Sequence, residues 1–126
     1  MDLITLEYID TLYSAEEKKE ITFSKYLLKE PYNLKSLFVI RVDGKSMQPV
    51  INDKALVVAD LSKKTLENDS IYLLYKGEKM WIKKAKKEKG KDSFIFVSIN
   101  EEYSHLIYQE NEVRVVAKAL LTFTQL

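Results

Sequence analysis

Residues 38–49 of this 126-residue chain read FVIRVDGKSMQP, an apolar run that ends in a glycine turn followed by a serine. The β-branched and aromatic residues at its start are typical of a strand. Gly44 favours a tight turn, and Ser46 stands two positions after it, with Lys45 between them. A serine in this place can present its hydroxyl beside backbone N–H groups, although an ordinary turn with a capping serine has the same pattern. The stretch therefore predicts a strand-to-loop junction with Ser46 as a candidate nucleophile.

Similar short runs fill the rest of the chain and predict a mostly β fold. Gly77 and Gly90 each lie in a polar spacer between two runs, where glycine accepts the positive φ of a tight hairpin. The strand between these two turns should therefore be central in an antiparallel meander. We expect short antiparallel strands and hairpins, with strands at residues 37–42, 55–60, 70–75, 79–84, 93–98 and 112–122.

Residues 1–35 differ from this pattern, with seven acidic side chains, five lysines and no glycine. They are too few to enclose a core, so we expect an extended N-terminal arm at 1–35 and one domain at 36–126. Ser14 and Glu17 have the spacing of a capping box, and a short helix over residues 14–20 is one alternative for the arm. Residues 22–28 would then either extend this helix or form a separate segment.

The composition excludes several classes of function. With 20 basic and 19 acidic side chains the net charge is +1, which gives no sign of a nucleic-acid or membrane partner. The absence of cysteine excludes disulfides, thiolate metal sites and cysteine nucleophiles, and His105 alone cannot form a multi-histidine site. We therefore expect no metal and no cofactor, and a structural role for His105. No apolar stretch approaches the roughly twenty residues that span a bilayer, so a cytoplasmic protein is expected.

A serine nucleophile needs a base, and with one histidine in the chain the known alternative is a lysine. Such a lysine acts only when burial keeps its amine neutral. Lys83 follows the apolar residues 80–82 inside the predicted central strand, and Lys84 is its neighbour. Because side chains alternate along a strand, the two lysines should point to opposite faces. Alternation does not decide which of them faces Ser46.

Five of these stretches, taken in order, resemble the C-terminal catalytic domain of the LexA, UmuD and phage-repressor family of self-cleaving serine peptidases. The resemblance covers about residues 37–123 and includes the 37-residue separation of Ser46 and Lys83. Its parts are the nucleophile motif at 38–49, the next strand at 51–60, the strand before the lysine at 68–75, the lysine motif at 81–85 and a Ser-x-Asn-x-x-Tyr turn at 98–103.

The resemblance implies a LexA-like peptidase fold in which Ser46 is the nucleophile and Lys83, rather than its neighbour, is the general base. Backbone N–H groups of Ser46 and Met47 would hold the oxyanion. Met47 and Trp81 would help to keep water away from the amine. The resemblance also implies self-cleavage in the SOS response to DNA damage, prompted by a RecA filament. It further implies a homodimer through residues 113–123, although this run could instead close the sheet within one subunit.

Two features depart from the family pattern. Family members cut their own chain at an Ala-Gly or Cys-Gly bond, whereas the nearest equivalent by position here is Ala15-Glu16, our candidate scissile bond. A non-cleaving dimerisation or regulatory domain is therefore an alternative function. The arm is also too short for the helix-turn-helix domain through which such repressors bind DNA. We expect the C-terminal part of a longer repressor, which residues 21–28 favour by their resemblance to phage-type repressors, or else a stand-alone UmuD-like protein.

A lysine-rich run at residues 79–91 leaves a further alternative open. It holds seven lysines and one acidic residue. Such a run could bind the phosphates of single-stranded nucleic acid as part of a small β-barrel. A solvated hairpin tip is the simpler interpretation.

Overall fold

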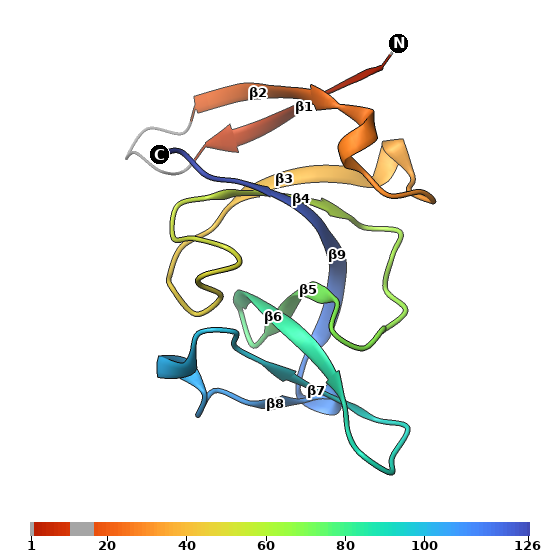
Figure 1. Cartoon of the computed structure of the whole chain (residues 1–126), viewed down its shortest axis with the longest axis vertical. Helices are drawn as coiled ribbons and strands as arrows, with labels where there is room; N and C mark the ends of the chain where they lie inside the picture. Colours follow the sequence, from red (N-terminus) through yellow and green to blue (C-terminus); the bar gives the residue numbers. More distant parts are fainter. Residues whose placement is uncertain (1, 11–16) are drawn as a thin grey trace.

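The computed structural model describes residues 2–10 and 17–126, and this part of the chain is mostly β (Figure 1). A two-stranded β1-β2 hairpin accompanies a seven-stranded sheet of order β3-β4-β9-β5-β6-β7-β8. The expected fold class is confirmed. The elements are β1 (Leu3–Asp10), β2 (Glu17–Ser24), η1 (Lys25–Leu27), η2 (Leu34–Ser36), β3 (Leu37–Arg41), β4 (Leu56–Asp60), β5 (Ile71–Lys76), β6 (Lys79–Lys87), β7 (Phe94–Val97), η3 (Glu101–Tyr103), β8 (Tyr108–Gln109), η4 (Glu110–Glu112) and β9 (Arg114–Phe123).

The N-terminal arm forms a hairpin, because β1 and β2 pair antiparallel along their whole length. The helix considered for residues 14–20 is therefore wrong for residues 17–20, which begin β2, while 14–16 lie outside the described residues. Ile21 and Phe23 alternate with more exposed residues along β2. In a strand both side chains lie on one face, whereas in a helix the two side chains would point about 160° apart around the axis. The alternation explains why the strand is formed.

This hairpin packs on the sheet and shares a core with it. Figure 1 shows it lying over β3, on the side of the sheet where the C-terminus ends. The rings of Phe23 and Phe123 lie 5.6 Å apart, which joins β2 to the end of β9. The buried residues of this shared cluster are Ile4, Phe23, Leu28, Leu37, Val39 and Val58.

The six strands predicted after residue 36 are all present, with ends shifted by a few residues. Gly77 and Gly90 lie in the two predicted hairpin turns with φ of 63° and 77°, in the region that glycine tolerates best. As expected, β6 is central, since it pairs with β5 on one side and β7 on the other. The two-residue strand β8 was not predicted.

The long strand β9 joins the two halves of the sheet, as Figure 1 shows. Residues 118–123 pair with β4, and residues 114–118 pair with β5. This run therefore closes the sheet within one subunit, and the homodimer stays a prediction. The consequence for the site is geometric, because β9 brings the loop that follows β3 close to β6.

Other classes of site are not seen in the part of the chain that the structure describes. None of its helices has the length and apolarity needed to cross a membrane. No group of three histidine or acidic side chains there could hold a metal ion. His105 is exposed after η3.

Candidate active site

Ser46 lies in the loop between β3 and β4, called here the nucleophile loop (residues 43–54). The two ends of this loop are joined by a hydrogen bond of 2.8 Å from the N–H of Val42 to the carbonyl of Ala55. Met47 is only 2% exposed and packs in the core beneath the loop. Because the Met47 side chain is anchored inward, its neighbour Ser46 stays half-buried at the surface.

The turn before Ser46 depends on Gly44 and Asp53. Gly44 has a φ of +118°, which side-chain-bearing residues rarely adopt. Its N–H donates to Asp53 Oδ1 over 2.8 Å. This hydrogen bond is the main reason why the pKa of the Asp53 carboxyl lies below its ordinary value. The two ends of the loop are thereby tied together across Ser46.

Lys83 points from β6 toward this loop. Its Nζ lies 3.0 Å from Ser46 Oγ, and the side chain is 0% exposed. Lys84 points to the other face, where its Nζ lies 3.5 Å from the Asp69 carboxylate. The alternative left open by strand alternation is thus resolved geometrically, since Lys83 is the lysine that meets Ser46.

The surroundings of Lys83 favour its neutral form. Burial lowers the pKa of Lys83 from 10.5 to about 8. No described carboxylate forms an ion pair with this amine, so nothing there offsets the loss of hydration. The ring of Trp81 covers it, with the ring centroid 5.4 Å from Nζ. At mildly alkaline pH a large fraction of Lys83 therefore carries the lone pair that a base needs.

The backbone N–H groups of the nucleophile loop differ in whether they have a hydrogen-bond acceptor. The hydrogen bond that closes the turn comes from the N–H of Gln48, which donates to the Lys45 carbonyl over 3.1 Å. Within the described residues the N–H groups of Ser46 and Met47 have no acceptor. These are the two donors that the resemblance implied for an oxyanion.

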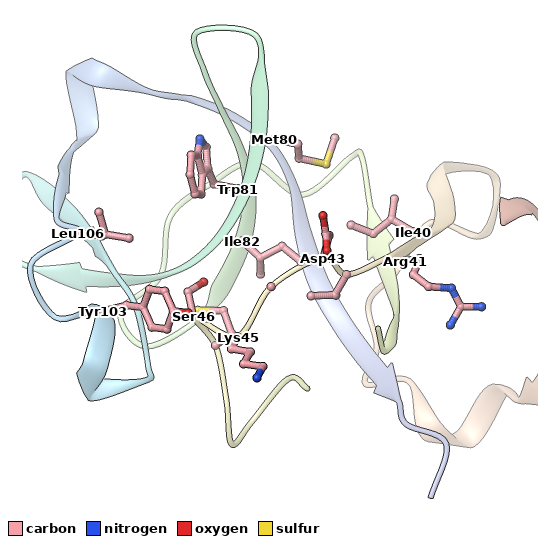
Figure 2. Close-up of a pocket in the computed structure, with 13 residues that line it drawn as sticks. Ile40, Arg41, Asp43, Lys45, Ser46, Met80, Trp81, Ile82, Tyr103 and Leu106 are labelled. Atoms are coloured by element: carbon pink, nitrogen blue, oxygen red, sulfur yellow. The ribbon is translucent and has the colours of Figure 1, made fainter. Parts of the chain in front are cut away.

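Ser46 opens into a pocket of about 250 Å³ (Figure 2). Figure 2 shows Ser46 near Tyr103, while the guanidinium of Arg41 points away from both. Most of the lining comes from the end of β3, the nucleophile loop and β6, and much of it is apolar, including Ile40, Val42, Met80, Trp81, Ile82 and Leu106. The lining also includes the charged residues Arg41, Asp43 and Lys45.

The turn at residues 98–103 makes contacts that the sequence analysis did not assign. Ser98 Oγ lies 3.0 Å from Lys83 Nζ. The Asn100 N–H donates to the Ser46 carbonyl over 2.9 Å, and its Nδ2 donates to the Lys45 carbonyl over 2.9 Å. The Ser-x-Asn spacing at 98–100 was the signal available in the sequence, but only the sheet register shows what it contacts.

The remaining sequence candidates lie elsewhere. The candidate scissile bond Ala15-Glu16 falls outside the described residues. In the lysine-rich run, Lys84 and Lys86 both contact Asp69. With Lys83 buried, the run presents less free charge than its composition indicates, which favours the solvated hairpin over the nucleic-acid alternative.

Two comparisons relate the chain to known proteins. A stretch of 64 residues, 51% of the chain, is 39% identical to a Haemophilus influenzae protein described as an uncharacterized HTH-type transcriptional regulator. That stretch covers 26% of the regulator's length, so the similarity is to about a quarter of that protein. Residues 8–120 match the Peptidase S24-like family, a range that includes both Ser46 and Lys83. Because this match spans most of the described strands, the chain belongs to the Peptidase S24-like family, the LexA, UmuD and phage-repressor type.

Proposed function

We propose that this chain is the C-terminal domain of a LexA-like or phage-type transcriptional repressor, and that it cuts a peptide bond with a Ser46–Lys83 dyad. The observation that carries the proposal is the 3.0 Å contact between Ser46 Oγ and the Nζ of a fully buried lysine. Membership of a serine peptidase family supports the reaction class. The printed description of the Haemophilus relative supports the repressor context.

In the proposed reaction the neutral amine of Lys83 takes the proton of the Ser46 hydroxyl as Oγ attacks the peptide carbonyl carbon. The carbonyl oxygen becomes an oxyanion, which the N–H groups of Ser46 and Met47 receive. The protonated Lys83 then gives its proton to the leaving amine as the C–N bond breaks. Water, deprotonated by the same lysine, hydrolyses the resulting ester and restores Ser46.

The wider context of the reaction is also part of the proposal. Residues 1–35 would be the arm that carries the cleavage region, and residues 36–126 the peptidase and dimerisation domain. Self-cleavage in the SOS response, prompted by a RecA filament, would inactivate a homodimeric repressor. DNA contact would belong to a helix-turn-helix domain outside this chain.

A second candidate function follows from the bond at Ala15-Glu16. A bulky acidic residue stands where the family has glycine. The chain would then be a non-cleaving dimerisation or regulatory domain, or a stand-alone UmuD-like protein, that retains the dyad geometry. An intact chain after exposure to activated RecA supports this alternative, whereas a fragment that begins near Glu16 contradicts it.

The test is mass spectrometry of the chain after long alkaline incubation, alone and with a synthetic peptide that contains an Ala-Gly bond. Wild type should cleave at least one of the two, and Lys83→Ala and Ser46→Ala should lose more than about 99% of the rate. Lys84→Ala is the matched control, because it removes a neighbouring lysine that points away from Ser46. Identical products from wild type and Lys83→Ala would overturn the proposal.

A further inference from the structure

Lys83 stands between two hydroxyl groups, and only one of them belongs to the dyad. Ser98 Oγ, like Ser46 Oγ, lies 3.0 Å from its Nζ. The sheet register explains this second contact. Lys84 pairs with Val97 in the β6–β7 ladder, so the next position places Ser98 across from Lys83. Ser98 follows β7 directly and is therefore held by the sheet itself.

We propose that Ser98 is a positioning residue for Lys83, whose hydroxyl accepts an N–H of the neutral amine and so directs the lone pair of Nζ toward Ser46. This inference rests on the proposed function of the dyad. It adds a role for a residue that neither attacks the substrate nor accepts its proton.

The direction of each hydrogen bond follows from the atoms available. A neutral amine has two N–H donors and one lone pair. If the Ser46 hydroxyl gives its proton to that lone pair, the contact with Ser98 has to use an N–H of the amine, with Ser98 Oγ as acceptor. A donating Ser98 hydroxyl would occupy the lone pair and block the base. Without Ser98, rotation about the Cε–Nζ bond would leave the lone pair in three equivalent directions.

The turn at residues 98–103 also contacts the loop that carries Ser46, and this observation is independent of the contact between Ser98 and Lys83. Asn100, two residues after Ser98, donates from its backbone N–H to the Ser46 carbonyl and from Nδ2 to the Lys45 carbonyl, both over 2.9 Å. One short segment thus contacts the base and the loop of the nucleophile. Its two ends set the distance between Lys83 and Ser46.

Within the described residues, neither of the two nearby tyrosines hydrogen-bonds to the Lys83 amine, which contacts Ser46 and Ser98. Tyr72 is the residue paired with Lys83 on β5, and its hydroxyl donates to the Thr65 carbonyl over 2.9 Å. Tyr103 lines the pocket at the end of the same turn. A change at Ser98 should therefore act on the amine directly.

The experiment is an NMR titration of Lys83, followed through its ¹³Cε resonance and assigned with Lys83→Met. In Ser98→Ala the charged amine loses an acceptor, so the midpoint should fall by roughly 1 pH unit below that of wild type. Ser98→Thr keeps the hydroxyl and should restore the midpoint. Ser93→Ala is the matched control, because Ser93 precedes β7 as Ser98 follows it, and its hydroxyl contacts Glu88 instead.

An unchanged midpoint in Ser98→Ala would overturn the inference, and so would a raised one, because it would show that Ser98 had been donating to the lone pair. This readout requires no turnover, so it is separate from the proposed function, which fails if wild type and Lys83→Ala cleave alike. In a cleavage assay Ser98→Ala should lose roughly 10- to 100-fold in rate, with recovery in Ser98→Thr. A rate equal to that of wild type would contradict the positioning role.

Discussion

Lys83 shows how far one residue can depart from its ordinary chemistry when the fold removes water from it. A lysine is rarely buried without a carboxylate partner, because loss of hydration disfavours the ammonium form. Here the pKa falls to about 8, with burial as the cause, and two serine hydroxyls take the place of a counter-ion. In the proposed reaction this amine, which is buried at a cost in stability, takes the proton from Ser46.

At the same scale, Asn100 should matter through the loop it contacts. Asn100→Ala removes the hydrogen bond to the Lys45 carbonyl and leaves the nucleophile loop less restrained. We expect the rate of cleavage to fall by roughly 10-fold, with little change in KM, and the Gln48 amide to exchange hydrogen faster. Hydrogen exchange and steady-state kinetics measure the two effects.

Asn52→Ala is the matched control for this prediction, because Asn52 lies in the same loop and its side-chain amide donates over 3.4 Å to Thr124 Oγ1, outside the loop. Equal exchange rates in the two variants would show that Asn100 does not restrain the loop.

At the scale of elements, the ion pair between Asp10 and Arg41 joins the β1-β2 hairpin to β3. Asp10 is 2% exposed, and its carboxylate accepts hydrogen bonds of 2.9 and 2.6 Å from Nε and Nη2 of Arg41. The remaining Nη1 donates to the carbonyl of Lys54, in the nucleophile loop. One guanidinium thus connects the hairpin, the edge of the sheet and the loop that carries Ser46.

Asp10→Asn should therefore destabilise the protein more than an ordinary surface change. The substitution removes the buried negative charge that Arg41 and Lys19 both contact, and we expect a loss of about 2–4 kcal/mol in the free energy of unfolding. Urea denaturation measures it. Glu7→Gln is the control on the same strand, because its exposed pair with Lys18 should contribute less than about 1 kcal/mol. Equal, small losses in both variants would show that the buried pair does not hold the hairpin.

The elements also show what can be read from the sequence. The strands after residue 36 were predictable because β-branched runs alternate with glycine turns, as at Gly77 and Gly90. The hairpin at the start was missed because its many charged residues mask a weak apolar alternation, and Ser14 and Glu17 have the spacing of a helix cap. That alternation becomes meaningful only when β3 supplies the surface on which the hairpin packs.

For the site, residue types and spacing were enough to identify Ser46 and two candidate lysines. Strand alternation left the choice between Lys83 and Lys84 open, and the family resemblance favoured Lys83. The contact of the Lys83 amine with Ser46 Oγ depends on the pairing of β6 with its neighbours, which a single sequence does not contain. Ser98 and Asn100 were missed for the same reason, since their contacts cross between strands and loops that are distant in the chain.

At the scale of the whole molecule, burial of Lys83 makes stability depend on pH. The pKa of Lys83 is about 8 in the folded state and 10.5 where the lysine is unperturbed, as in the unfolded chain. Between these values the unfolded chain binds more protons, so the free energy of unfolding rises with pH. Below pH 8 both states are protonated, and the cost of burying the charge is fully present.

Lys83→Met should remove this dependence, because it keeps most of the volume and carries no charge. The variant should be more stable than wild type at pH 7, and this advantage should shrink by roughly 2–3 kcal/mol between pH 7 and pH 10. Urea denaturation of both proteins at the two pH values gives the difference. Lys84→Met, at a partly exposed site, should show no such change. A constant difference for Lys83→Met would mean that the buried amine is not neutralised in this range.

The central claim is that neutral Lys83 activates Ser46, and it can be tested without knowing the scissile bond. The measurement is the rate at which a fluorophosphonate probe labels Ser46, monitored by mass spectrometry at pH values from 6 to 10. We expect the rate to rise with a midpoint near the Lys83 pKa of about 8 in wild type and in Lys84→Ala, and labelling to be lost in Lys83→Ala and Ser46→Ala. A rate profile that is the same in wild type and Lys83→Ala would contradict the claim.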